Sequence, residues 1–350
     1  MPPREEYEEY LRGIWDREYI TNNGPLVKEL ETKLKSHLNI EEILYLANGT
    51  VALQIAIKAL ALEGDIITTP FSYVATTSSI VWESCNPIFV DIDSDSFNIN
   101  PRLIENAISE KTTAILATHV FGNPCDIESI QTIADEYDLK VIYDAAHCFG
   151  TLYKGESVFN YGDISTSSFH ATKLFHTVEG GAVFSSNERL MKKMSRMRNF
   201  GHDGAERFKG VGINGKNSEF HAAMGLVNLN YIDDIIKVRK EHCSYYDKKL
   251  GDAVKKQIID YQSESNHSYY PVVFSSEKEA LKVKNELESN QIFPRRYFYP
   301  SLDTLDYIAG SYDVTVSKNI AASILCLPLF YELTRDDQDE IASRILNVIS

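Results

Sequence analysis

Lys173 and its neighbours have the clearest potential for chemistry in this sequence. Lys173 ends the segment SFHATK (168–173), in which the hydroxyl of Ser168 lies five residues before the lysine. Upstream, the apolar run 141–143 ends at the carboxylate of Asp144. Pyridoxal 5'-phosphate (PLP) requires an amine that forms an imine, an acid for its pyridine nitrogen and donors for its phosphate. These residues therefore predict a PLP site in which Lys173 carries the cofactor as an internal aldimine.

Asp144 is expected at the end of a buried strand, where parallel-sheet proteins place their ligands. A carboxylate bonded to the pyridine N–H keeps the ring protonated, so that the ring can accept electrons from the substrate. Two simpler interpretations stay open at this point. Asp144 can cap a following helix, and Lys173 can be a surface lysine that follows a strand.

A phosphate site is predicted at the segment ANGT (47–50), between a short apolar run at 43–46 and an apolar helix at 51–62. Gly49 permits a tight turn, and the first N–H groups of the helix then form an anion site together with the helix dipole. Thr50 and Ser168 each add a hydroxyl donor. Thr50 can also act as an N-cap, and this role is compatible with phosphate binding.

Two aromatic side chains are candidates for contact with the cofactor ring. Tyr73, in PFSYVAT (70–76), follows another strand end, where it can stack on the pyridine ring or belong to the core. His147 follows Asp144 by three residues and can approach the ring from the opposite face. His170 is interpreted as structural.

Bulk composition restricts the partners and the compartment. The net charge of −15 argues against nucleic acid or an anionic membrane as the main partner. No stretch approaches the roughly 20 apolar residues of a membrane span, and the polar start is unlike a signal peptide. The five cysteines are scattered without a Cys-x-x-Cys pair, which favours reduced cytoplasmic thiols and predicts no metal site.

Alternating helical and apolar strand-like segments predict βαβ units and a mostly parallel sheet. Strands are expected at 43–46, 65–69, 87–91, 113–120, 140–144, 163–169, 181–185, 268–274 and around 292. Helices are expected at 25–38, 51–62, from 100 onward, and at 126–137, 218–250, 277–288 and 336–348. We expect a large cofactor-binding domain over 1–235, with an N-terminal helical segment, and a small C-terminal α+β domain over 236–350.

Over nearly its whole length the chain resembles the DegT/StrS family of PLP-dependent sugar aminotransferases, which have the fold-type I architecture. The motifs that carry the resemblance are TNNGP (21–25), ANGT (47–50), TPFSYVAT (69–76), DAAH (144–147), SFHATK (168–173), EGG (179–181) and GINGK (212–216). The cofactor-binding residues that the resemblance implies are Gly49, Thr50, Tyr73, Asp144, His147, Ser168, Lys173 and Asn214. Asn214 matches an asparagine that reaches the phosphate of the other subunit, which implies a homodimer with shared active sites.

The expected substrate contacts are Lys216, Arg295 and Arg296. Lys216 stands where the family often has an arginine, and a lysine cannot form the same two-pronged grip on a carboxylate. The segment FPRRYFYP (293–300) is similar to one in members that act on 4-keto-6-deoxy nucleotide sugars. Arg295 and Arg296 can meet a diphosphate or a carboxylate, or they can be two solvated cations.

The resemblance implies amino transfer from L-glutamate, through pyridoxamine phosphate, to a nucleotide-linked 4-keto-6-deoxy sugar. The likeness is strongest to members that form dTDP-4-amino-4,6-dideoxy-D-glucose for surface glycans such as O-antigen. The alternatives are amination at C3, a PLP- or pyridoxamine-dependent dehydratase, and a non-catalytic ligand-sensing protein. Lys173 argues against the dehydratase, because histidine replaces that lysine in dehydratases of this kind.

Overall fold

A seven-stranded sheet forms the centre of the molecule. The structure is a computed structural model that describes residues 1–21 and 23–350, so Asn22 of the first family motif lies outside the described residues. The strand order is β1-β9-β8-β5-β4-β2-β3, and five strands from β8 to β3 are parallel to their neighbours. β9 is antiparallel to both β8 and β1. The bounds are β1 Ile43–Leu46, β2 Asp65–Thr68, β3 Asn86–Phe89, β4 Thr112–Thr118, β5 Lys140–Asp144, β8 Ile164–Ser168 and β9 Gly181–Phe184.

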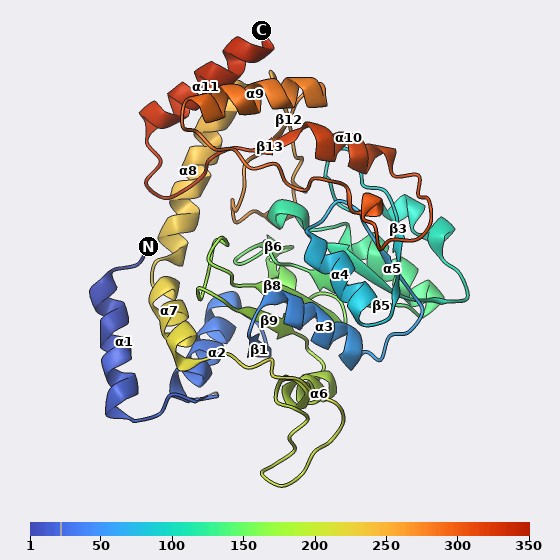
Figure 1. The fold of residues 1–350 in the computed structure, drawn as a ribbon, viewed down its shortest axis with the longest axis vertical. Coiled ribbons are helices and arrows are strands. Elements are labelled where there is room, and N and C mark those ends of the chain that lie inside the picture. The colour runs from blue at the N-terminus through green and yellow to red at the C-terminus, as the bar shows by residue number, and fades with distance from the viewer. Residues whose placement is uncertain (22) are drawn as a thin grey trace.

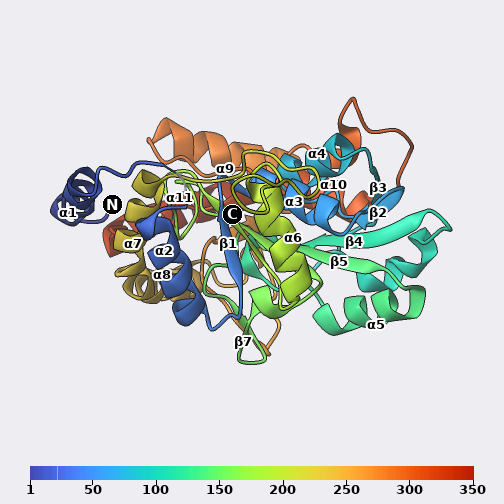
Figure 2. The same cartoon turned by 90° about the horizontal axis from the view of Figure 1, so that it is seen from below.

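Helices cover both faces of this sheet (Figure 1, Figure 2). Successive residues of a strand point to opposite faces, and Val141 and Ile142 of β5 accordingly belong to two different cores. Helices α2, α5 and α7 contribute to the first core, and α3, α4 and α6 to the second. The bounds are α1 Arg4–Asp16, α2 Pro25–Leu38, α3 Gly49–Ala59, α4 Val74–Trp82, α5 Ile127–Tyr137, α6 Glu188–Arg198 and α7 Glu219–Leu229.

The C-terminal part of the chain builds a separate apolar core around a small antiparallel sheet. Its strand order is β10-β12-β13, and α8, α9 and α11 pack on it. The predicted boundary at residue 235 falls inside α8, and the two-domain division stays a prediction. The bounds are α8 Ile232–Leu250, β10 Lys255–Lys256, β12 Pro271–Val273, α9 Glu277–Ser289, α10 Thr315–Ser323, β13 Ile324–Cys326 and α11 Arg335–Ile349. A third sheet joins the hairpin β6 Leu152–Tyr153 and β7 Glu156–Ser157 to β11 Ser263–Glu264.

The expected fold class is confirmed, and three sequence-based elements are wrong. The single helix over 218–250 is two helices, because the chain turns at Asn230 and Tyr231 between α7 and α8. The helix expected from Asn100 is only two short 3-10 turns, since β-region backbone at Ile108 ends the second. Near Ile292 the chain forms a single bridge between Arg295 and Cys326 instead of a strand.

The topology brings distant segments to one edge of the sheet. β1, β2, β4, β5 and β8 run in one direction, so their carboxyl ends all open on the same side. In a sheet of this kind, ligands bind at that edge. Among the described residues, no helix is both long and apolar enough to cross a lipid bilayer.

Candidate active site

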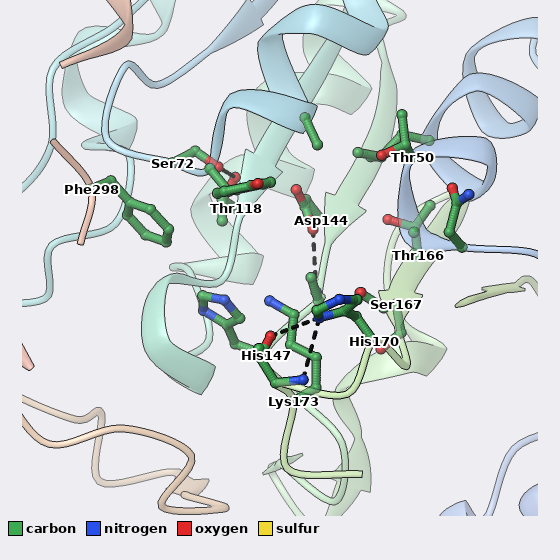
Figure 3. A pocket seen from close by; sticks show the side chains of 18 of the residues that line it. Thr50, Ser72, Thr118, Asp144, His147, Thr166, Ser167, His170, Lys173 and Phe298 are labelled. Atoms are coloured by element: carbon green, nitrogen blue, oxygen red, sulfur yellow. Dashed lines mark hydrogen bonds between the residues drawn. The ribbon is translucent and has the colours of Figure 1, made fainter. Parts of the chain in front are cut away.

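A cavity of about 480 Å³ lies at the carboxyl edge of the sheet. Figure 3 shows Asp144, His147 and Lys173 gathered around one space, with Ser72 and Thr118 to one side. Eight of the residues predicted from the sequence line this cavity: Gly49, Thr50, Tyr73, Asp144, His147, Ser168, Lys173 and Arg295. The structure therefore assembles most of the predicted constellation from five separate segments of the chain.

Asp144 is the buried acid of the cavity, with 6% of its surface exposed. Its Oδ2 accepts a hydrogen bond of 2.6 Å from the Thr76 hydroxyl, and its Oδ1 accepts one of 3.2 Å from the Ala146 N–H. Burial raises the pKa of this carboxyl, and the two hydrogen bonds and the charge of Lys173 oppose that rise. Within the described part of the chain Asp144 forms no ion pair, so the carboxylate remains available to a cationic group in the cavity.

Lys173 is the amine of the cavity, and it lies in the loop between β8 and β9. Burial lowers the pKa of Lys173 from 10.5 to about 8. The negative charge of Asp144 acts in the opposite direction, whereas the positive charge of Arg295 lowers the pKa further. An amine with a pKa near 8 has a far larger neutral fraction at physiological pH than an ordinary lysine, and this neutral fraction can act as a nucleophile or a base.

His147 presents a neutral aromatic ring to the cavity. Burial lowers its pKa well below the ordinary value, and the charge of Lys173 adds to this effect. The ring stacks on Phe298 with 5.8 Å between centroids and an interplanar angle of 8°. Its Nδ1 is buried without a hydrogen-bond partner in the described chain.

The start of α3 forms a corner of unpaired donors. Asn48 Oδ1 accepts from the Val51 N–H at 2.9 Å, whereas the Gly49 and Thr50 N–H groups have no partner within the described residues. A Cβ at Gly49 would lie 2.9 Å from Ser168 Cβ, so glycine allows the helix start to touch the end of β8. These N–H groups, with the Thr50 and Ser168 hydroxyls, fit an anionic group such as a phosphate.

Tyr73 and Arg295 mark the rim of the cavity. Tyr73 lies immediately before α4 and is 57% exposed, so its ring is free to cover a ligand. The Arg295 guanidinium donates to the Tyr297 hydroxyl at 2.9 Å. It adds positive charge to the cavity, where an anionic substrate can meet it.

Three other predicted residues lie outside the cavity. Arg296 donates to Glu277 at 2.5 Å and to the Ala322 carbonyl at 2.7 Å, so its guanidinium is bound elsewhere. Asn214 is exposed and accepts a hydrogen bond of 2.7 Å from Lys216. Asn214 and Lys216 lie in the segment between α6 and α7. The middle of this segment projects from the body of the molecule (Figure 1), whereas Gly215, between the two residues, packs on α3.

Sequence reasoning missed several residues of the site. Thr76, Ser72 and Thr118 form a hydroxyl network behind Asp144, and Phe298 supports His147. His170, interpreted as structural, lines the cavity beside Glu179, with 3.5 Å between Nε2 and Oε1. The one signal in the sequence was the run of hydroxyl residues around Tyr73, which does not indicate what those hydroxyls contact.

The family model for the DegT/DnrJ/EryC1/StrS aminotransferases matches residues 3–346. The chain is 42% identical to a dTDP-4-amino-4,6-dideoxy-D-glucose transaminase of Shigella dysenteriae, over 99% of this chain and 97% of the relative. It is 38% identical to an Escherichia coli transaminase of the same name, over 99% and 96%. The crystal structure of DesI with its TDP-sugar product superposes with a TM-score of 0.94, at 29% identity over 100% of this chain and 91% of DesI.

This protein belongs to the DegT/DnrJ/EryC1/StrS aminotransferase family. It is a PLP-dependent aminotransferase. The residues of the cavity fit that cofactor. Among the residues that the structure describes, they offer a buried acid without an ion pair, unpaired donors at a helix start and an amine of lowered pKa.

Asp144 and Arg295 act on the pKa of Lys173 in opposite directions, so removing each charge should shift the titration of Lys173 in opposite directions. In the cofactor-free protein, acetylation of Lys173 by acetic anhydride should rise with pH around a midpoint near 8, because only the neutral amine reacts. Asp144→Asn should move the midpoint to lower pH, and Arg295→Ala should move it to higher pH. Peptide mass spectrometry across a pH series measures all three. A wild-type midpoint near 10.5, or shifts of the same sign, would contradict the assigned electrostatics.

Proposed function

We propose that this protein transfers the amino group of L-glutamate to a nucleotide-linked 4-keto-6-deoxy sugar. The proposed acceptor is dTDP-4-keto-6-deoxy-D-glucose, and the product is dTDP-4-amino-4,6-dideoxy-D-glucose. The observation that carries the proposal is the convergence of Lys173 and Asp144 with the donor corner of α3 in one cavity. Support for the substrate comes from the 42% and 38% identity to two transaminases named for this product.

The cofactor, when bound, supplies an electron-accepting ring to which amino groups are attached and from which they are released. Lys173 would hold it covalently in the resting enzyme. Asp144 would accept a hydrogen bond from the pyridine nitrogen and stabilise its positive charge. Gly49, Thr50 and Ser168 would hold the phosphate through N–H and hydroxyl donors, and Tyr73 and His147 would contact the ring.

Lys173 would have a second role as a free amine. It would accept a proton from the substrate carbon and return it during amino transfer. The pKa near 8 suits this role, since the group can both accept and return a proton close to neutral pH. Arg295 at the rim is the proposed contact for the glutamate carboxylate or the sugar diphosphate.

Loss of the amine should stop turnover without preventing cofactor binding. We expect Lys173→Ala to reduce turnover by at least ~10²-fold, because general acid–base catalysis is lost along with the covalent attachment. The assay mixes purified protein, PLP, L-glutamate and dTDP-4-keto-6-deoxy-D-glucose, and detects the amino sugar by mass spectrometry. Lys111→Ala, in a surface loop before β4, is the matched control and should keep wild-type turnover.

Two results would contradict this proposal. One is absence of an amino-sugar product from the wild-type protein with this acceptor while a 3-keto sugar nucleotide is aminated, which would favour amination at C3. The other is wild-type turnover by Lys173→Ala, which would show that another residue acts as the amine.

We also propose that two copies of the chain share their active sites, with Asn214 contributing to the partner's phosphate site. The segment between α6 and α7 projects from the body of the molecule (Figure 1) and exposes large apolar side chains. These are Phe200, Phe208, Val211 and Ile213, with exposures of 50%, 67%, 76% and 42%. Apolar groups gathered in this way favour cover by a partner.

Mixed dimers separate a shared site from an unshared one. When a Lys173→Ala chain pairs with an Asn214→Ala chain, a shared arrangement leaves one complete site, and turnover should recover to about half of wild type per dimer. Each mutant homodimer, which has no complete site, is the control. The mixed species is purified through two different tags. If the mixed dimer stays as inactive as the homodimers, Asn214 does not serve the partner's site.

A further inference from the structure

A chain of three hydroxyl groups leads to the buried carboxylate of Asp144. Thr76 Oγ1 donates to Asp144 Oδ2 at 2.6 Å. Ser72 Oγ lies 2.7 Å from Thr76 Oγ1 and 2.9 Å from Thr118 Oγ1. The chain therefore joins the start of α4 and the end of β4 to the end of β5. Figure 3 shows two of its members, Ser72 and Thr118, on one side of the cavity.

Counting hydrogens fixes the direction of this chain. A hydroxyl carries one hydrogen, and an ionised carboxylate can only accept, so Thr76 uses its hydrogen on Asp144. The bond between Ser72 and Thr76 must then be donated by Ser72, and the bond between Thr118 and Ser72 by Thr118. All three O–H dipoles thus point toward the carboxylate.

The surroundings make this direction energetically important. Thr76, Ser72 and Thr118 are 0%, 1% and 4% exposed, so water competes weakly for their hydrogen bonds. In such a site, aligned hydrogen bonds polarise and strengthen one another. Burial raises the pKa of Asp144, and the bond from Thr76 opposes that rise. Lys173 is the cation whose charge acts on Asp144 from the other side of the cavity.

We propose that Thr76, Ser72 and Thr118 act as positioning residues that hold Asp144 ionised and oriented toward the pyridine nitrogen of the cofactor. This inference rests on the proposed role of Asp144 and extends it. Thr76 contributes directly, Ser72 acts through Thr76, and Thr118 acts through both. In this role the three hydroxyls affect the reaction only through the carboxylate, although Ser72 and Thr118 also line the cavity.

A matched control lies next to Thr76 on the same helix. The Thr77 hydroxyl is also fully buried, yet it has no hydrogen-bond partner within the described chain. Thr76→Val and Thr77→Val therefore remove the same group at equal burial, and only the first removes a bond to Asp144. Thr76→Ser keeps the hydroxyl and tests rescue, whereas Ser72→Ala keeps Thr76 but removes its donor.

The experiment uses PLP labelled with 15N at the pyridine nitrogen, bound to the full-length protein. The nitrogen chemical shift reports protonation, and a titration of the cofactor-free protein gives the dissociation constant. Thr76→Val should move the shift toward the unprotonated value and raise the dissociation constant roughly tenfold, the scale of one lost bond to a charged group. Ser72→Ala should show a smaller change of the same sign, and Thr76→Ser and Thr77→Val should match wild type.

Three outcomes decide the inference. Equal shifts and equal dissociation constants for Thr76→Val and Thr77→Val overturn it. Ser72→Ala without effect overturns the relay, even where Thr76→Val proves too unstable to purify. An unprotonated nitrogen in the wild-type protein, unchanged by Asp144→Asn, instead overturns the proposed role of Asp144 itself, and this result is distinct from the other two.

Discussion

Burial of an acid and an amine in one cavity is the interaction on which the site depends. Burial favours the neutral form of each group, and it raises the pKa of Asp144 while lowering that of Lys173. Each charge opposes the effect of burial on the other. The result is an amine reactive near neutral pH in the same cavity as a carboxylate that forms no ion pair within the described chain. A cofactor with an aldehyde and a pyridine nitrogen would use both groups. The sheet makes this possible because its parallel strands end at one edge.

The overall negative charge of the protein makes local donors essential for anionic ligands. The chain carries a net charge of −15, so long-range attraction does not bring a phosphate or diphosphate to the cavity. The phosphate corner instead uses neutral donors, the N–H groups of Gly49 and Thr50 and two hydroxyls. Arg295 at the rim places positive charge where a substrate anion enters. Local hydrogen-bond donors and one positive charge therefore supply the attraction for anionic ligands that the overall charge of the protein does not supply.

Much of the large sheet could be predicted from the sequence, because its buried strands are continuously apolar. The strand expected at 140–144 matches β5 Lys140–Asp144, and Asp126 caps α5 where a helix start was expected. Helices α4 and α6 escaped prediction. Residues 74–82 contain β-branched and hydroxyl residues in place of a helical apolar period, and only packing on the second core makes them helical. The turn at Asn230 and Tyr231 was hidden for a related reason, since nothing between α7 and α8 breaks a helix locally.

The residues of the site likewise divide into those that could be predicted from the sequence and those that could not. Lys173, Asp144 and Gly49 could be proposed because each residue type at a strand end has few chemical uses, and the family resemblance joined them. The hydroxyl network could not be proposed, because its members are 46 and 68 residues from the groups they bond. Arg296 shows the converse: adjacent arginines look equivalent in sequence, but Glu277 binds only one of them.

The most direct test of this account is to reduce the PLP-loaded protein with borohydride and to map the labelled peptide by mass spectrometry. We expect a single phosphopyridoxyl group on Lys173, and none when Lys173 is replaced by alanine. A label on another lysine, or no label in a protein that still binds PLP and transfers amino groups, would contradict the central claim that the buried amine of this cavity is the cofactor's attachment point.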